Sequence, residues 1–485
     1  MAGAITEPTL AAPSAPVIDA ALGRIRAIVG DRGWTTDPGE IAPHVIDQRD
    51  RYHGAAAMLV KPADTAQVAA VVGVCADQGI AIVPQGGNTS VCGGSVPGTG
   101  GDEIVLNLSR MNRVRDIDPA NYTLCAEAGC ILADLQAAAA EADRLFPLSL
   151  AAEGSCEIGG NLSTNAGGIN VLRYGMARDL VLGLEVVLPD GTVWDGLRAL
   201  RKDNTGYDLK QLFIGAEGTL GVITAAVLKL FPIPRVVTTA LVAVAGLDEA
   251  LTLLSCARSA SGDQVSAFEL LPRIALDFVC AHVPGTRDPL AKPHDHYVLI
   301  ELSSGDPGPA LAETMERLLG QAVEDGLVLD GVIAANTGQS RDLWKLRDSC
   351  SEAQKHEGGS IKHDVSVAVS RVPEFIRRAT ALVEAAIPGA RPVPFGHVGD
   401  GNIHFNVSQP PGADKAEFLD QWDALNRIVH DLVHEMGGSF SAEHGVGQLK
   451  RDDLARYRPA IELALMRRIK TALDPRGIMN PGKVV

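Results

Sequence analysis

Residues 44–90 read HVIDQRDRYHGAAAMLVKPADTAQVAAVVGVCADQGIAIVPQGGNTS, and this stretch decides the fold of the N-terminal part of the chain. A short apolar run is followed by a segment in which apolar residues recur at helical spacing, namely Val68, Val71, Val72 and Cys75. We expect a helix that begins at Thr65 and ends at Gly79, before a second apolar run. Strand, helix and strand in this order predict a β-α-β unit.

The length of the chain indicates more than one domain. With 485 residues, of which 46% are apolar and 21% charged, two or three globular domains are expected. Pro232 and Pro234 mark a plausible boundary between the first two. We predict a flexible tail over 1–20, a first domain over 21–233, a second over 234–425, and a C-terminal segment over 426–485.

Charge and composition exclude several classes of protein. The formal net charge of −16 argues against a nucleic-acid binder, because phosphates are neutralised by clustered Lys and Arg. A run of 18 apolar residues is absent from the sequence, so we expect no membrane span. The first 20 residues lack the basic start of a signal peptide. Eight cysteines without a CxxC pair are typical of reduced thiols, which predicts a cytoplasmic protein.

Further strands and helices can be predicted along the chain. Residues 180–196, LVLGLEVVLPDGTVWDG, indicate two strands joined by a Pro-Asp-Gly turn. Residues 218–236, GTLGVITAAVLKLFPIPRV, indicate another strand pair. Helices should alternate with strands from about 235 to 330, and the end of the chain, 465–485, should form a helix followed by an extended segment.

Two glycine-rich stretches lie beside predicted strands. They are PQGGNTSVCGGSVPGTGG at 84–101 and EGSCEIGGNLSTNAGGINVLRYG at 153–175, and neither matches GxGxxG or a P-loop. Closely spaced glycines with Asn, Ser and Thr expose backbone N–H groups that can surround a pyrophosphate. Either stretch alone fits a set of tight turns. Two such stretches together favour a nucleotide cofactor.

Residues 395–407, FGHVGDGNIHFNV, place two histidines around an Asp-Gly pair. If Asp400 and Gly401 form a two-residue hairpin loop, His397 pairs directly with His404. Directly opposed Cβ atoms lie about 4.5–5.5 Å apart, so one metal ion can bind both rings. Asn406 should lie on the same face as His404. The alternative is a pair of buried, hydrogen-bonded histidines.

Several motifs resemble one known group of flavoproteins. Residues 83–90, 154–168, 173–175, 182–191 and 203–224 resemble the FAD-binding domain of the vanillyl-alcohol oxidase family, whereas 396–407, 441–452 and 474–483 resemble its 2-hydroxyacid dehydrogenase branch. The resemblance extends from about residue 40 to the end. It implies an α+β fold with a two-part FAD-binding domain, an α/β substrate (cap) domain and a C-terminal helical segment that completes the active site.

The resemblance implies FAD as cofactor. It assigns the FAD pyrophosphate to 84–90, the isoalloxazine and ribityl region to 154–168 and 215–223, and a closing role to 203–208. The implied FAD-binding residues are Pro84, Gly86, Gly87, Asn88, Thr89, Ser90, Gly154, Ser155, Gly159, Gly160, Asn161, Thr164, Asn165, Gly167, Gly168, Glu217, Gly218, Gly221 and Ile223. Members with covalent flavin carry a histidine where this chain has Asn88, so we expect non-covalent FAD.

The resemblance also implies a divalent metal, usually zinc, held by His397, His404 and Glu443. Two imidazoles and one carboxylate leave a coordination position open, which is typical of catalytic zinc. The same ligands can hold non-haem iron, and Mn²⁺ or Co²⁺ stay open.

His444 is the residue we expect to act as the base. A bound zinc ion lowers the pKa of a water ligand from about 15.7 to about 7, and a bound alcohol should respond in the same direction. A histidine can then accept the hydroxyl proton of the substrate. The alternative role for His444 is a solvated loop histidine.

Four residues are expected to bind the substrate: Arg347, Ser351, Lys362 and Asn406. Arg347 and Ser351 lie one helical turn apart, and Lys362 should begin the next strand. In related enzymes that act on 2-hydroxyglutarate the matching Arg, Thr and Lys recognise carboxylate, which favours a dicarboxylate substrate here. A second carboxylate without a cationic partner would be unfavourable. The alternative is that Lys362 is simply an exposed lysine.

These expectations combine into one reaction. We predict oxidation of D-2-hydroxyglutarate to 2-oxoglutarate by hydride transfer to flavin N5. The electrons would then pass to a protein such as electron transfer flavoprotein, or to a quinone. A D-lactate or glycolate dehydrogenase of the same family, a peroxide-forming oxidase and a flavin- or metal-binding scaffold without turnover are the alternatives. The sequence does not decide the oligomeric state, for which a homodimer is one option.

Overall fold

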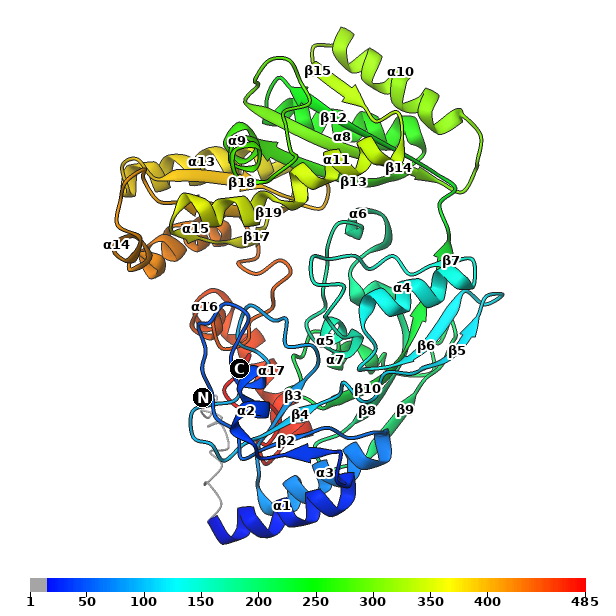
Figure 1. The fold of residues 1–485 in the computed structure, drawn as a ribbon, viewed down its shortest axis with the longest axis vertical. Coiled ribbons are helices and arrows are strands. Elements are labelled where there is room, and N and C mark those ends of the chain that lie inside the picture. Colours follow the sequence, from blue (N-terminus) through cyan, green and yellow to red (C-terminus); the bar gives the residue numbers. More distant parts are fainter. Residues whose placement is uncertain (1–14) are drawn as a thin grey trace. The chain divides into compact units, whose positions relative to one another are not determined.

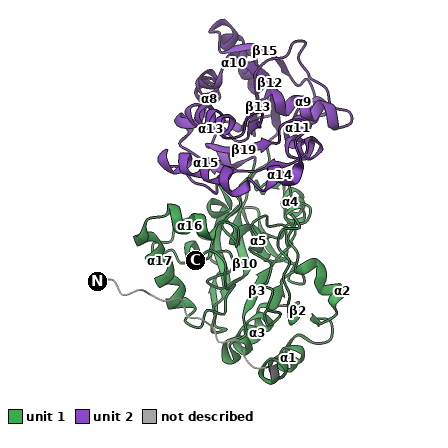
Figure 2. Ribbon diagram, turned by 90° about the vertical axis from the view of Figure 1, so that its left-hand side faces the viewer, with its two compact units in different colours: residues 1–168, 175–233, 443–485 green, residues 169–174, 234–442 purple. Residues whose placement is uncertain are grey.

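The structure is a computed structural model that describes residues 15–485. The chain divides into two compact units, shown in Figure 2. Unit 1 comprises 1–168, 175–233 and 443–485, and unit 2 comprises 169–174 and 234–442. Of the tail predicted over 1–20, the part up to residue 14 lies outside the described residues, and 15–20 differ from the prediction because they begin helix α1 (Ala15–Val29).

A small mixed sheet in unit 1 contains the β-α-β unit. Its strands are β1 (Trp34–Thr35), β2 (Met58–Val60), β3 (Ile82–Gln85) and β4 (Ile104–Asn107), in the order β1-β2-β4-β3 (Figure 1). Strand β1 pairs antiparallel with β2, and the other pairs are parallel. The predicted helix is confirmed as α3 (Thr65–Gln78). The Asp64 side chain accepts from the Gln67 N–H at its start, and Gly79 ends it at φ +69°. The valines of α3 pack with α1 and the strands in one core.

The second sheet of unit 1 is antiparallel. It consists of β5 (Val114–Asp118), β6 (Thr123–Glu127), β10 (Val222–Lys229), β8 (Val181–Val187) and β9 (Val193–Gly196), in that spatial order. The predicted pair β8 and β9 is confirmed. The pair predicted over 218–236 is wrong, because β11 (Phe231–Pro232) pairs with β7 (Arg144–Leu145). One residue between β10 and β11 is too short a loop to reverse the chain.

The remaining elements of unit 1 are short except at its end. They are α2 (Pro38–Ile41), η1 (Ala42–His44), α4 (Leu132–Glu141), α5 (Ile158–Ser163), η2 (Ala177–Leu180), α7 (Lys210–Phe213), α16 (Arg451–Tyr457) and α17 (Ala460–Leu473). Helix α17 confirms the helix predicted for the C-terminal segment. After it, Met479 forms a parallel bridge with Ile82, so the end of the chain lies beside β3.

Unit 2 begins with an antiparallel sheet covered by helices on both faces. Its order is β13 (Val265–Pro272), β14 (His296–Ser304), β12 (Val236–Val244) and β15 (Val328–Ile333). The helices are α8 (Leu247–Ser261), α9 (Arg273–His282), α10 (Ala310–Glu324) and α11 (Thr337–Asp348), so the predicted alternation is confirmed. Alternate residues of β12 face opposite cores, Val242 that of α8 and α10 and Leu241 that of α9 and α11.

A second sheet follows in unit 2. Strand β19 (Asn402–Ser408) pairs with β16 (Ser360–Ile361), β17 (Asp364–Ser366) and β18 (Arg391–Phe395). Its other elements are α12 (Cys350–Ala353), η3 (Gln354–Glu357), η4 (Val369–Arg371), α13 (Val372–Ala386), α14 (Lys415–Leu419) and α15 (Trp422–Glu435). Helix α15 buries Val429 and Val433 in the same core as α13. It therefore belongs to unit 2, and the C-terminal segment begins at residue 443 in the structure, not at 426 as expected.

Residues 169–174 form a separate piece of unit 2, although their neighbours in sequence belong to unit 1. They include the short helix α6 (Val171–Tyr174). The guanidinium of Arg173 donates to the carbonyl and hydroxyl oxygens of Ser303 on β14. The second glycine-rich stretch is thus divided between the two units after Gly168.

Candidate functional site

The two-residue hairpin predicted around Asp400 and Gly401 is wrong. His404 pairs with Phe395 instead of His397, and 396–401 form a longer loop between β18 and β19. The reason is Gly396, which adopts φ +137° and exchanges both backbone hydrogen bonds with Leu270 on β13. The chain therefore leaves its pairing with β19 before it reaches His397. Glycine permits this backbone conformation, which other residues rarely adopt.

The two imidazoles nevertheless come together inside unit 2. The ring centroids of His397 and His404 lie 5.4 Å apart, with 76° between the ring planes. The sequence thus predicted the right pair by the wrong backbone geometry. The loop, not a directly opposed strand pair, places His397 beside His404.

Glu269 on β13 holds His397 in place. Its Oε1 atom lies 2.7 Å from Nδ1 of His397, and its Oε2 atom accepts a hydrogen bond of 2.6 Å from Nε of Arg347. Glu269 is 1% exposed. Burial favours its neutral form, but His397 and Arg347 outweigh burial and lower the pKa of Glu269 to about 2. The carboxylate is therefore ionised and can only accept hydrogen bonds.

This contact decides which nitrogen of His397 can bind a metal. Because Glu269 only accepts, Nδ1 of His397 must carry the proton, and Nε2 keeps its lone pair. Carboxylate-held imidazoles with a free Nε2 are the usual arrangement around protein-bound metals. A nitrogen of Arg347 lies 3.4 Å from Nε2 of His397. The donor set of unit 2 thus fits a divalent ion.

His404 lies on β19 next to an acidic residue of the neighbouring strand. Asp364 pairs with it across β17 and β19, and Nδ1 of His404 is 3.9 Å from Oδ1 of Asp364. That carboxylate is buried and accepts a hydrogen bond from the side chain of Asn402. Negative charge thus lies close to both imidazoles, which favours a cation near them.

Glu443 and His444 follow unit 2 directly in the chain. The N–H of Ala442 donates to the carbonyl of Asp364, so the end of unit 2 lies beside β17. Glu443 is the first residue of the last segment of unit 1. Ala442, the last residue of unit 2, therefore lies beside the strand that pairs with His404.

The predicted substrate-binding residues lie in different surroundings. Arg347 is 7% exposed near the end of α11, whereas Ser351 is exposed on α12, so the two do not share one helix face as expected. The helix is interrupted at Ser349 between them. Lys362 is half-buried between β16 and β17 and does not begin a strand. Asn406 is 2% exposed and its amide donates to Gln354.

The three stretches assigned to FAD lie side by side in unit 1. Gly87 touches the second stretch so closely that a Cβ atom there would lie 2.1 Å from the carbonyl oxygen of Ser155. A Cβ atom at Gly218 would lie 3.1 Å from the ring of Pro84. The N–H of Glu217 donates to the carbonyl of Ser163 over 2.8 Å. Glycine at these positions is what permits the close approach.

The remaining residues that were assigned to FAD binding lie in the same three stretches. Residues 86–90 follow β3 in a loop, and Gly154 and Ser155 precede α5. Helix α5 contains Gly159, Gly160 and Asn161, and Thr164, Asn165, Gly167 and Gly168 follow it. Gly221 precedes β10, which contains Ile223. The structure therefore gathers all of these residues within unit 1.

Asn88 and Glu217 have structural roles within this region. The amide of Asn88 donates to the carbonyls of Pro43 and Ile46, and its oxygen accepts from Ser95. Glu217 is 7% exposed, and its carboxylate accepts the N–H groups of Val446 and Gly447 over 2.7 and 2.8 Å. Burial raises the pKa of Glu217, and these two N–H groups act against the rise. Glu217 thus anchors the loop that follows His444.

Two acidic residues of this architecture were missed in the sequence. Glu269 lies in the strand VSAFELLP, and Glu157 lies in the glycine stretch GSCEIGG. Both are almost fully buried. A single carboxylate within an otherwise apolar or glycine-rich run is the signal that could have identified them, because buried acids need partners.

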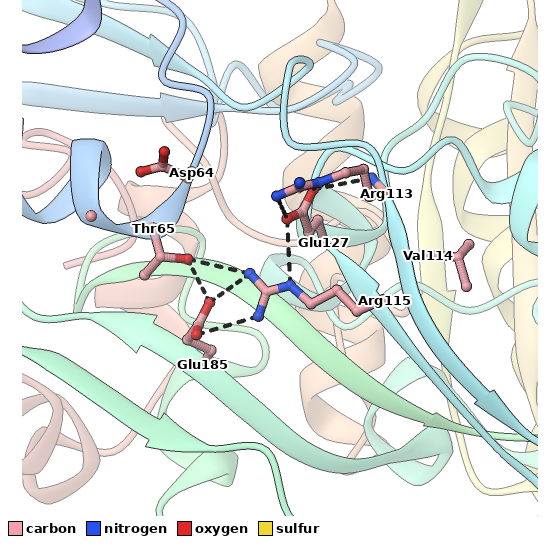
Figure 3. Close-up of a pocket in the computed structure, with 8 residues that line it drawn as sticks. Asp64, Thr65, Arg113, Val114, Arg115, Glu127 and Glu185 are labelled. Carbon is pink, nitrogen blue, oxygen red and sulfur yellow. Dashed lines mark hydrogen bonds and ion pairs between the residues drawn. The ribbon is translucent and has the colours of Figure 1, made fainter.

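A pocket of about 560 Å³ on unit 1 contains no predicted site residue (Figure 3). Its walls carry three ion pairs: Glu127 contacts both Arg113 and Arg115, and Arg115 also contacts Glu185. Thr65 at the start of α3 donates to Glu185. The carboxylates are thus neutralised by the arginines, and the network links α3 to the antiparallel sheet.

Among residues 15–485 we find no helix with the length and apolar character that a membrane crossing requires.

Comparisons with known proteins match both units. The family described as "FAD binding domain" matches residues 56–196, and "FAD linked oxidases, C-terminal domain" matches 233–484. The "D-2-hydroxyglutarate dehydrogenase, mitochondrial" of Bos taurus is 41% identical over 93% of this chain and 80% of its own. A protein of Oryza sativa subsp. indica named "Probable D-2-hydroxyglutarate dehydrogenase, mitochondrial" is 38% identical over 95% of this chain and 80% of its own.

A solved structure shows the same fold. It is p-cresol methylhydroxylase with substrate bound, with a TM-score of 0.75 and 18% sequence identity over 97% of both chains. The fold class predicted from the motifs is thereby confirmed. The two family matches extend over most of the chain, and the match to the FAD binding domain includes the stretches 84–90 and 154–168. The chain therefore belongs to the FAD-linked oxidase family and is an FAD-dependent oxidoreductase.

Proposed function

We propose that this chain oxidises D-2-hydroxyglutarate to 2-oxoglutarate with the help of FAD and a divalent metal ion. The observation that carries the proposal is the pair His397 and His404, with the proton of His397 fixed on Nδ1 by Glu269 so that Nε2 carries the lone pair. The relatives named D-2-hydroxyglutarate dehydrogenase support this choice of substrate. Bound FAD supplies the acceptor for two electrons, and the ion supplies a Lewis acid.

The proposed metal ligands are His397, His404 and Glu443. These three are one of two groups of His, Asp and Glu in the described residues that could hold an ion. Two imidazoles and one carboxylate leave a position for the substrate and suit zinc, with manganese and cobalt as alternatives. The position of Glu443, next to Ala442 in the chain, supports its inclusion.

His444 is the proposed base. It accepts the proton of the substrate hydroxyl, while the hydride of C2 leaves for the flavin. The loop that contains it is held by Glu217 through Val446 and Gly447. A base must keep a defined position to act at one hydroxyl, and this anchoring supports the role of His444.

Lys362 and Ser351 are proposed to bind the substrate carboxylates together with Arg347 and Asn406. The carboxylate of Glu269 already engages Nε of Arg347, so only the outer nitrogens of this guanidinium would serve the substrate. Lys362 is half-buried and therefore suited to a charge-assisted hydrogen bond with the distal carboxylate. This residue decides between a dicarboxylate and a monocarboxylate substrate in the proposal.

We propose non-covalent FAD, because Asn88 takes the place of the linking histidine and engages the backbone of Pro43 and Ile46. An electron-transfer protein such as electron transfer flavoprotein, or a quinone, is the proposed acceptor. A cytoplasmic location is proposed from the cysteine pattern alone, and a homodimer stays one option for its assembly.

Steady-state kinetics with an artificial dye acceptor test the proposal. We expect kcat/KM to be highest for D-2-hydroxyglutarate, lower for D-malate and lowest for D-lactate, with activity lost in EDTA and restored by zinc. Lys362→Met should lower kcat/KM for D-2-hydroxyglutarate by about 10- to 100-fold, which corresponds to one charge-assisted hydrogen bond, and leave D-lactate unchanged. A preference of the wild type for D-lactate, or full activity in EDTA, would contradict the proposal.

A further inference from the structure

Glu157 lies where two of the FAD stretches meet. It precedes α5 in the second stretch, and a Cβ atom added to Gly86 in the first stretch would lie 3.3 Å from its Oε2 atom. Glu157 is 6% exposed. Among the described residues, its Oε2 atom has no hydrogen-bond partner. A buried carboxyl oxygen without a partner is unfavourable, so the site is prepared for a further polar group.

The surroundings of Glu157 favour its neutral form. Burial raises the pKa of Glu157 to about 8, and Lys61 acts weakly in the opposite direction. The neighbouring thiols are Cys156, directly before it, and Cys130 across the backbone bridge between Ile131 and Glu157. Burial raises the pKa of both thiols, so they stay neutral over the range in which Glu157 ionises.

We infer that the neutral carboxyl group of Glu157 donates a hydrogen bond to an oxygen of the FAD diphosphate. This inference rests on the FAD-binding part of the proposed function. A protonated carboxyl group has one O–H donor, whereas an ionised one has none. A carboxylate and a diphosphate share the same sign of charge, and a buried site screens their repulsion poorly. Glu157 therefore binds FAD only while it holds its proton.

The consequence is an FAD affinity that depends on pH. Only protein in which Glu157 is protonated is competent to bind FAD. The apparent Kd for FAD equals the intrinsic Kd divided by this protonated fraction. With a pKa of about 8, nearly all of the protein is competent at pH 7. At pH 9 about one molecule in eleven is competent, so we expect FAD to bind about tenfold more weakly.

The test is titration of the apoprotein with FAD, followed by quenching of flavin fluorescence at pH 7, 8 and 9. The wild type should lose about tenfold in affinity between pH 7 and pH 9. Glu157→Gln, which keeps an N–H donor and cannot ionise, should bind equally well at all three values. Glu157→Ala, which removes the donor, should bind about tenfold more weakly than the wild type at pH 7, without pH dependence.

Two controls make the test specific. Glu153 lies in the same stretch, but its carboxylate already accepts from Ser149 and Gln136, so Glu153→Gln should keep the pH dependence of the wild type. ADP carries the diphosphate without the isoalloxazine. Its affinity should fall between pH 7 and pH 9 in the wild type and stay constant in Glu157→Gln.

Each unfavourable outcome has a distinct meaning. A wild-type FAD affinity that is constant from pH 7 to pH 9 would overturn the inference and leave the flavoprotein function intact. An affinity that depends on pH for FAD but not for ADP would overturn the assignment to the diphosphate. The same pH dependence in Glu157→Gln would show that another group is responsible. Absence of FAD binding at pH 7 would overturn the proposed function together with the inference.

Discussion

The flavin region of unit 1 and the histidine region of unit 2 are built in opposite ways. In unit 1 the close contacts involve backbone, as at Gly87, where a Cβ atom would lie 2.1 Å from the carbonyl oxygen of Ser155. In unit 2 the close contacts join charged side chains, as between Glu269, Arg347 and His397. The flavin region depends on residues that have no side chain to obstruct a backbone contact. The histidine region depends on side chains whose charges complement one another.

This difference predicts how each region fails. A buried charge that loses its partner is costly, because neither water nor another side chain replaces the partner. A methyl group forced into a tight backbone contact is also costly, but local shifts can relieve part of the strain. We therefore expect single substitutions to act more strongly on chemistry in the histidine region than on cofactor binding in the glycine region.

His397→Ala should have the largest effect on turnover. It removes a proposed metal ligand and leaves Glu269 with one partner, Arg347. Loss of Lewis-acid assistance worth several kcal/mol corresponds to about a thousandfold lower kcat. Metal content by mass spectrometry and dye-coupled kinetics should fall together. His282→Ala, at a histidine paired with Glu357 away from this site, is the control. Full zinc content in His397→Ala would remove its role as a ligand.

His444→Ala comes next and separates proton transfer from cofactor binding. General-base catalysis contributes about 10²–10⁴-fold, so anaerobic bleaching of the flavin by substrate should slow by at least about a hundredfold. The flavin spectrum should be unchanged, because the glycine stretches are untouched. His53→Ala, at an exposed histidine of unit 1, is the matched control. Bleaching at the wild-type rate would exclude His444 as the base.

Glu269→Gln should weaken metal binding without removing it. The amide can no longer balance the charge of Arg347 or fix the proton on Nδ1 of His397. Substitution of a carboxylate that orients a metal-binding histidine typically costs 10–100-fold in metal affinity. Competition for zinc against a chelator measures this change directly. Glu301→Gln, at a half-buried carboxylate that accepts from Trp344, should leave zinc affinity unchanged.

Gly87→Ala should have the smallest effect on catalysis by enzyme that has FAD bound. Overpacking of this kind costs about 1–3 kcal/mol, which we expect as a lower thermal midpoint and about tenfold weaker FAD binding. Once saturated with FAD, the variant should turn over normally. Gly73→Ala is the control, because Gly73 lies on α3 outside the three FAD stretches and a Cβ atom there meets nothing within 4 Å. Equal losses in both variants would contradict the backbone-contact account of this region.

Many of the elements and the groups of candidate residues could be predicted from the sequence. The helix over Thr65–Gln78, the alternating helices and strands after residue 235 and the two glycine-rich stretches at 84–101 and 153–175 follow from local spacing, turn residues and caps. The proximity of the His397 and His404 rings was also predictable, although the hairpin expected to cause it is wrong. These features depend on residues close in sequence, so their physical causes are visible in a single stretch of chain.

The way in which distant parts of the chain meet depends on tertiary contacts that the sequence does not reveal. The register of β18 and β19 depends on Leu270, which takes the hydrogen bonds of Gly396 from another strand. Glu269 lies 128 residues from His397, and no local pattern connects them. His397 and Arg347 then keep Glu269 ionised against the effect of burial, whereas burial raises the pKa of Glu157. Solvation and charge partners set a pKa, and both exist only after the chain has folded.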